Sequence, residues 1–98
     1  MTKNEAKSLK IGQKIYFKGQ YSGISFLELQ KEPETVTDSD GTEYIHLYFT
    51  DNTYELVGDN GNNYLFLTEK DAYTTLVKEL SDFLKQIKKK LKALDKKD

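Results

Sequence analysis

The hydrophobic positions of this chain follow a strand pattern up to about residue 67 and a helical pattern after it. In residues 43–50, Ile45, Leu47 and Phe49 alternate with polar positions and predict the core face of a strand. The opposite face of that strand carries Tyr44, His46 and Tyr48. The pattern therefore predicts a half-buried strand with an aromatic outer side.

Four more segments predict short strands, at residues 11–19, 24–32, 53–58 and 63–67. In the first of these, Ile11, Ile15 and Phe17 share the face expected to be buried. Pro33 lacks a backbone donor and indicates a strand end or a sheet edge. About five strands joined by short turns favour an antiparallel β-meander or an SH3-like partial barrel.

One long amphipathic helix is predicted from about Thr68 to Leu94, which makes the fold class α+β. Thr68 is a suitable N-cap, because its hydroxyl can accept a bond from an early helical N–H. Apolar residues then recur with alternating spacings of four and three, at Tyr73, Val77, Leu80, Leu84, Ile87, Leu91 and Leu94. The stripe is wider in its first half, so we expect three parts: a polar lead-in (1–10), a β domain with the packed half of the helix (11–84) and a basic helical extension (85–98).

The amino-acid composition excludes several kinds of stabilising and binding site. The 98 residues suffice for one core, and the lack of cysteine excludes disulfides and thiolate metal sites. The chain shows no secretory signal and no apolar run long enough to span a membrane, so a cytoplasmic protein is expected. All 15 basic residues are lysine, and without the bidentate arginine fork no specific reading of nucleic acid is expected.

The charge is distributed unevenly along the chain. Residues 11–82 hold 5 lysines and 13 acids, a net −8, whereas residues 83–98 hold 7 lysines and 2 acids, a net +5. The acidic part is either a solvated surface or a face that meets a basic protein partner. Candidate partner-contact residues are Tyr44, His46, Tyr48, Asp38, Asp40 and Glu43. The aromatic members either form an open platform or are buried beneath the helix.

The lysine-rich end of the helix has three interpretations. It is the solvated end of a core helix, a contact with a polyanion, or a seam for self-association or a protein partner. The candidate polyanion contacts are Lys85, Lys88, Lys89 and Lys92. The candidate seam consists of Leu80, Leu84, Ile87, Leu91 and Leu94. In a parallel homodimer Lys90 can pair with Asp95 of the second copy.

Motifs for catalysis or cofactor binding are not found in the sequence. The run from Asp38 to Gly41 resembles part of a calcium loop, but Val36 and Leu47 stand where that loop needs ligands. A hairpin turn is therefore predicted there. His46 is the only histidine, which leaves little material for a metal site or a catalytic triad. We expect no enzyme activity, no metal and no cofactor.

Two short stretches resemble a known group of proteins. Ile11, Gly12, Ile15, Tyr16 and Phe17 form an IGxxIYF opening, and residues 66–72, FLTEKDA, come directly before the helix. This layout is similar to small uncharacterised proteins of low-GC Gram-positive bacteria and their phages, from which the chain departs by its lysine-rich extension. The resemblance implies a phage or mobile-element context, in which small acidic proteins often block a host nucleic-acid enzyme.

The function expected from the sequence is therefore that of a non-enzymatic protein-binding module. One concrete form is an inhibitor of a host nucleic-acid enzyme, such as a defence nuclease, acting through an acidic surface. The alternative is a nucleic-acid or membrane accessory protein that acts through the lysine-rich helix.

Overall fold

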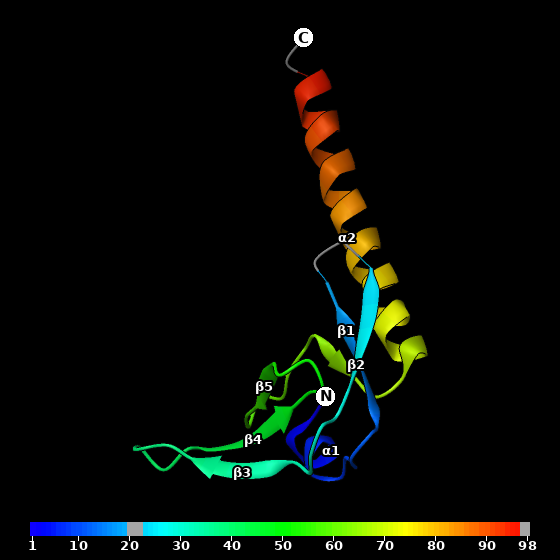
Figure 1. The fold of residues 1–98 in the computed structure, drawn as a ribbon. Helices are drawn as coiled ribbons and strands as arrows, with labels where there is room; N and C mark the ends of the chain where they lie inside the picture. Colours follow the sequence, from blue (N-terminus) through cyan, green and yellow to red (C-terminus); the bar gives the residue numbers. More distant parts are fainter. Residues whose placement is uncertain (20–22, 97–98) are drawn as a thin grey trace.

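The computed structural model confirms an α+β fold, with antiparallel sheets followed by one long helix, and describes residues 1–19 and 23–96 (Figure 1). The elements in chain order are α1 (Lys3–Lys7), β1 (Lys14–Lys18), β2 (Ile24–Glu28), β3 (Glu34–Thr37), β4 (Glu43–Tyr48), β5 (Tyr54–Val57), β6 (Leu65–Phe66) and α2 (Glu69–Asp95). The strands form two three-stranded sheets with the orders β2-β1-β6 and β3-β4-β5.

The two sheets are joined at the end of β2. Leu29 forms an antiparallel bridge with Phe49, and the N–H of Thr50 donates to the carbonyl of Glu28 at 3.0 Å. The N–H of Gln30 donates to the carbonyl of Tyr48 at 2.8 Å. These bonds connect β2 to β4, so the inner faces of the two sheets enclose one core.

The sequence did not predict β3. Pro33 directly precedes it, and Thr35, Val36 and Thr37 supply the β-branched side chains that favour a strand. Because β3 lies at the edge of its sheet, the missing N–H of Pro33 removes no ladder bond. The sheet edge predicted at Pro33 is therefore confirmed, but the strand that follows Pro33 was not predicted and raises the number of strands from five to six.

The core contains Ile15, Ile45, Leu47 and Phe49, which the alternation selected, and also Ala6 and Leu9 from the predicted polar lead-in. Its largest fully buried side chains are Phe49, Ile15, Leu29, Ile45, Leu47, Leu65 and Val57. The ring of Phe17 packs edge-on against that of Phe49, with centroids 5.2 Å apart. The prediction was wrong for Ile11, which is 62% exposed, because Gly12 turns the chain at φ 82° and β1 begins only at Lys14.

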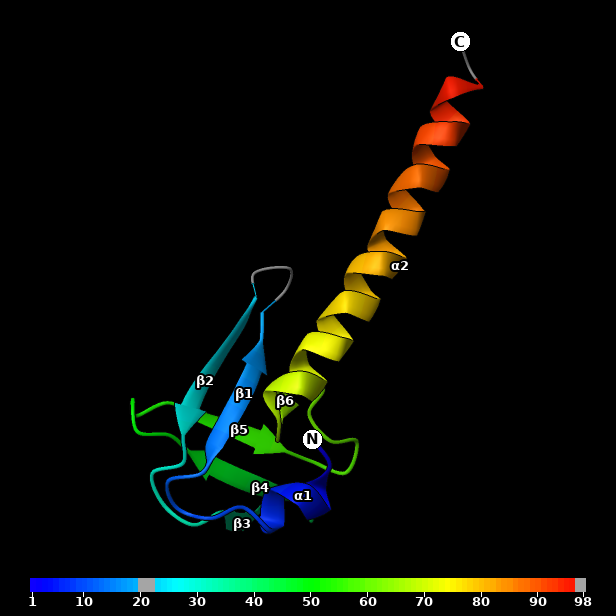
Figure 2. The same ribbon diagram turned by 90° about the vertical axis from the view of Figure 1, so that its right-hand side faces the viewer.

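Helix α2 begins as predicted, since the Thr68 hydroxyl accepts a bond from the N–H of Asp71 at 3.1 Å. Its buried residues are Ala72 and Leu76, and Lys18 of β1 pairs with Glu79 at 2.7 Å. Beyond Glu79 every described residue of the helix is exposed, and the buried side chains of α2 lie in its first two turns. The rest of α2 projects away from the sheets (Figure 2).

Candidate functional site

Among the described residues, exposed apolar side chains line one face of the β3-β4-β5 sheet and one stripe of α2. The first, which we call the outer face, is the side of the β3-β4-β5 sheet turned away from the core. Strand register assigns its members, because residues directly opposite each other in neighbouring strands point to the same side. They are Glu34, Val36, Tyr44, His46, Tyr48, Tyr54 and Leu56.

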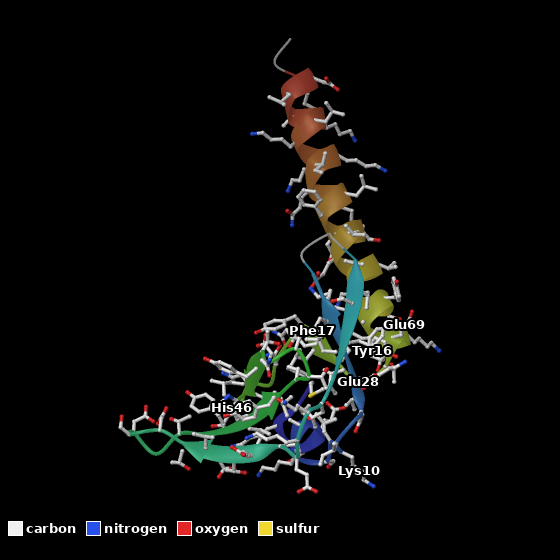
Figure 3. All side chains as sticks on the ribbon, viewed as in Figure 1. Lys10, Tyr16, Phe17, Glu28, His46 and Glu69 are labelled. Carbon is white, nitrogen blue, oxygen red and sulfur yellow. The ribbon has the colours of Figure 1, made fainter. Side chains whose placement is uncertain are left out.

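Helix α2 packs on β1, β2 and β6 and leaves the outer face uncovered. Figure 3 shows His46 on its sheet, well away from α2. Val36, Tyr54 and Leu56 on the neighbouring strands are 40%, 58% and 42% exposed. The interpretation in which the helix covers Tyr44, His46 and Tyr48 is therefore wrong, although these three side chains are themselves half-buried.

The centre of the outer face is a cluster of three rings. His46 stacks on Tyr48 with centroids 4.1 Å apart and meets Tyr54 edge-on at 4.7 Å. The Tyr48 hydroxyl lies 3.1 Å from Nδ1 of His46, while Nε2 is buried and has no hydrogen-bond partner among the described residues. The His46 ring therefore packs between the rings of Tyr48 and Tyr54.

The outer face already holds one cation. The ammonium of Lys31 lies 4.0 Å from the centre of the Tyr48 ring and 2.9 Å from a carboxylate oxygen of Glu34. The hydrogen bond to Glu34 raises the pKa of Lys31. An ammonium above an aromatic ring and beside a carboxylate is a favourable cation–π arrangement. The same chemistry suits a lysine or arginine side chain of a protein partner.

A shallow hollow of about 360 Å³ extends the outer face at Tyr44. Its lining consists of Thr42, Tyr44, Leu56, Gly58, Asp59, Asn60 and Gly61. The Tyr44 ring lies against Gly58, where an added Cβ would come within 3.2 Å of two ring atoms. Glycine at position 58 therefore allows the tyrosine ring to form one wall of the hollow.

The structure separates the acidic candidates from the aromatic ones. Glu43 points to the opposite side of β4, where its carboxylate pairs with Lys7 at 3.2 Å and Lys3 at 3.4 Å. A hydrogen bond from Lys7 is the main cause that lowers the pKa of Glu43. Because side chains alternate along a strand, Glu43 cannot share a surface with Tyr44. Glu43 therefore lies apart from the aromatic candidates, and its role in a partner contact stays a prediction.

Asp38 and Asp40 lie in the turn between β3 and β4, as the sequence predicted. The Asp38 carboxylate accepts bonds from the N–H groups of Asp40 and Thr42, each at 3.1 Å. A hydrogen bond with Asp38, followed by bonds from Thr42, lowers the pKa of Asp40 to about 2. These carboxylates stabilise the turn, and within residues 1–19 and 23–96 no cluster of acids or histidine suits a metal ion.

Sequence reasoning missed Lys31, Tyr54 and Leu56 as members of the outer face. Tyr54 and Leu56 come from β5, and only the pairing of Tyr48 with Tyr54 and of His46 with Leu56 places them beside the predicted residues. The alternation within residues 53–58 was the available signal. It could not assign a face, because the register between strands is set in three dimensions.

The second open surface is the apolar stripe of α2, which we define as Tyr73, Val77, Leu80, Leu84, Ile87, Leu91 and Leu94. All seven side chains are between 41% and 62% exposed. Lys85, Lys88, Lys89 and Lys92 are also exposed and form no ion pair in the described part of the chain. None of the described helices is long and apolar enough to cross a membrane.

Comparisons with known proteins give no assignment for either surface. No protein-family model matches the chain, no curated protein is significantly similar to it, and no solved structure matches its fold at a significant level.

Proposed function

We propose that the protein is a non-enzymatic protein-binding module and that the outer face is its partner-contact surface. The observation that carries the proposal is the uncovered cluster of His46, Tyr48 and Tyr54, with exposed Val36 and Leu56 beside it. Exposed apolar patches edged by polar groups are typical of protein interaction sites. Tyrosine is also among the residues that contribute most to binding energy in such sites.

The partner that best complements this domain is a basic protein. Residues 11–82 have a net charge of −8, from 5 lysines and 13 acids. Negative potential speeds the encounter with a positively charged surface. Enzymes that act on nucleic acids present such surfaces, so one form of the proposal is an inhibitor of a nucleic-acid enzyme, such as a defence nuclease, in the cytoplasm of a host carrying a phage or mobile element.

The test compares two double variants in pull-downs from host lysate. Tyr54→Ser with Leu56→Ser removes exposed apolar area from the outer face without touching the core. We expect a basic protein to be retained by the unchanged chain at low salt and lost with this variant. Raising the salt concentration should also release it, because screening weakens the charge attraction.

The matched control is Phe26→Ser with Ile24→Ser on the β2-β1-β6 sheet. These residues lie in a strand on the other sheet, so the control variant should retain the partner. A basic protein retained equally by both variants would contradict the proposed surface. A partner retained without any dependence on salt would contradict the role of the acidic charge.

We also propose that the stripe of α2 is a contact between two copies of the chain. The stripe runs on past the last packed residue, and the sheets leave it exposed over its whole length. Three heptads of apolar residues are enough for a weak helical dimer. Self-association would double the number of outer faces in one particle and so strengthen binding to a partner with two sites.

A second candidate function is contact with a polyanion through the lysines of α2. It is favoured by the absence of ion pairs from Lys85, Lys88, Lys89 and Lys92 in the described residues. Deleting residues 84–98 should leave the β domain folded, because the buried residues of α2 lie before this segment. If this candidate is right, the full chain binds DNA or anionic vesicles at low salt and the deletion variant does not. No binding by the full chain would eliminate it.

A further inference from the structure

The stripe of α2 is separate from the flank that packs on the sheet. Ala72 and Leu76 face the sheet, whereas Tyr73 and Val77 are 47% and 62% exposed. At about 100° per residue the centre of the stripe lies roughly a quarter turn from the packed flank. The stripe therefore runs unbroken over 21 steps from Tyr73 to Leu94, which is about 32 Å along the helix.

From this geometry we infer that the stripe is occupied by the same stripe of a second copy, with the two α2 helices antiparallel. This inference rests on the self-association proposed above and adds the direction, the register and the residues in contact. The stripe supplies Val77, Leu84 and Leu91 as a positions and Tyr73, Leu80, Ile87 and Leu94 as d positions. The strict repeat of seven residues is that of helices that coil around each other.

Charge along α2 decides the direction. Residues 69–82 hold 2 lysines and 4 acids, a net −2, whereas residues 83–96 hold 6 lysines and 1 acid, a net +5. A parallel dimer places the +5 half against its own copy, where like charges repel. An antiparallel dimer places it against the −2 half of the second copy and near an acidic β domain. One Lys90–Asp95 pair at each side of a parallel seam does not offset that repulsion.

The register follows from pairing a positions with d positions. In this register, each residue of one helix lies opposite the residue of the second helix for which the two residue numbers add up to 171. Val77 then meets Leu94, Leu80 meets Leu91, and Leu84 meets Ile87. By symmetry this gives six layers. The last described residue, Lys96, then lies level with position 75 of the second copy. The second helix therefore ends before it reaches the loop that leads into α2.

The size of this contact suits a reversible dimer. Six apolar side chains from each copy, each about half exposed in the single chain, would bury an area of the order of 1,000 Å². That is near the smallest area at which specific interfaces form. We therefore expect dimers at high micromolar protein concentration and monomers on strong dilution.

The test uses the full chain, which contains no cysteine of its own. Light scattering gives the mass, and oxidation of cysteine variants gives the direction. In the antiparallel register the double variant Val77→Cys with Leu94→Cys brings positions 77 and 94 of different copies together, so it should form a covalent dimer. Leu94→Cys alone should not, since the two copies of position 94 lie about 26 Å apart along the axis.

Each outcome bears on a different statement. A monomer at high micromolar concentration overturns self-association and this inference together but leaves the outer face unaffected. A dimer in which Leu94→Cys alone cross-links efficiently is parallel and overturns only the direction. A dimer in which neither variant cross-links overturns the register. As a matched control, Lys78→Cys with Lys92→Cys, on the flank away from the seam, should cross-link in neither arrangement.

Discussion

Replacing Phe49 by alanine is expected to lower the free energy of unfolding by about 3–5 kcal/mol. The Phe49 side chain is fully buried and packs edge-on against the ring of Phe17. The backbone of Phe49 also forms a β-bridge with Leu29. Its removal leaves a cavity where the two sheets meet, and strands on both sides cannot move inward to fill it. For a domain of this size the loss is a large part of the total stability.

Urea unfolding followed by circular dichroism measures the effect, as a lower midpoint at an unchanged slope. The matched control is Phe26→Ala, which removes the same ring from a position that is 51% exposed. We expect that control to lower the free energy of unfolding by less than about 1.5 kcal/mol, because the half-exposed ring of Phe26 buries less apolar area than the ring of Phe49. Equal losses for the two variants would show that Phe49 does not hold the sheets together.

Replacing Gly61 by alanine is expected to cost about 2–4 kcal/mol, the second largest effect. An added Cβ would lie 2.7 Å from the carbonyl oxygen of Met1. That oxygen also accepts a bond of 2.8 Å from the N–H of Asn62, so backbone must move on both sides to relieve the clash. Overpacking of this kind costs about 1–3 kcal/mol. The φ of +75° adds about 1 kcal/mol for any residue with a Cβ.

Gly41→Ala separates these two contributions. Gly41 also has a positive φ, of +87°, but an added Cβ there meets nothing within 4 Å. Thermal unfolding of the two variants should therefore show the larger drop for Gly61→Ala, with the difference equal to the cost of the clash. A drop of the same size in both would mean that the clash of the added Cβ with Met1 is relieved at little cost.

Local patterns were sufficient for much of the fold. Ile45, Leu47 and Phe49 alternate with polar residues, and their burial follows because a strand has only two faces. Thr68 was identified as an N-cap because capping depends on the next three residues alone. The turn at Asp38 depends likewise on bonds within five residues. Each of these predictions needed only neighbours in the chain, and each is confirmed.

Errors occurred where an element could be placed only by its contact with a distant one. Ile11 continues the apolar alternation, but β1 starts at the point where β2 can pair with it, three residues later. The first half of the α2 stripe was expected to pack on the sheet, but it stays exposed, and the side chains buried there are Ala72 and Leu76 on its flank. The small side chain of Ala72 allows α2 to approach the sheet closely, and periodicity does not report that preference.

The candidate site shows the same division. Sequence alone determined that Tyr44, His46 and Tyr48 share one side of a strand and that α2 carries a seven-residue apolar repeat. Tertiary structure decided that the helix packs on the other sheet, that Tyr54 joins the aromatic cluster and that Glu43 faces α1. The physical reason is the distance along the sequence over which each property is set. The direction of a side chain depends on its own strand or helix, whereas its burial depends on contacts with segments that are distant in the sequence.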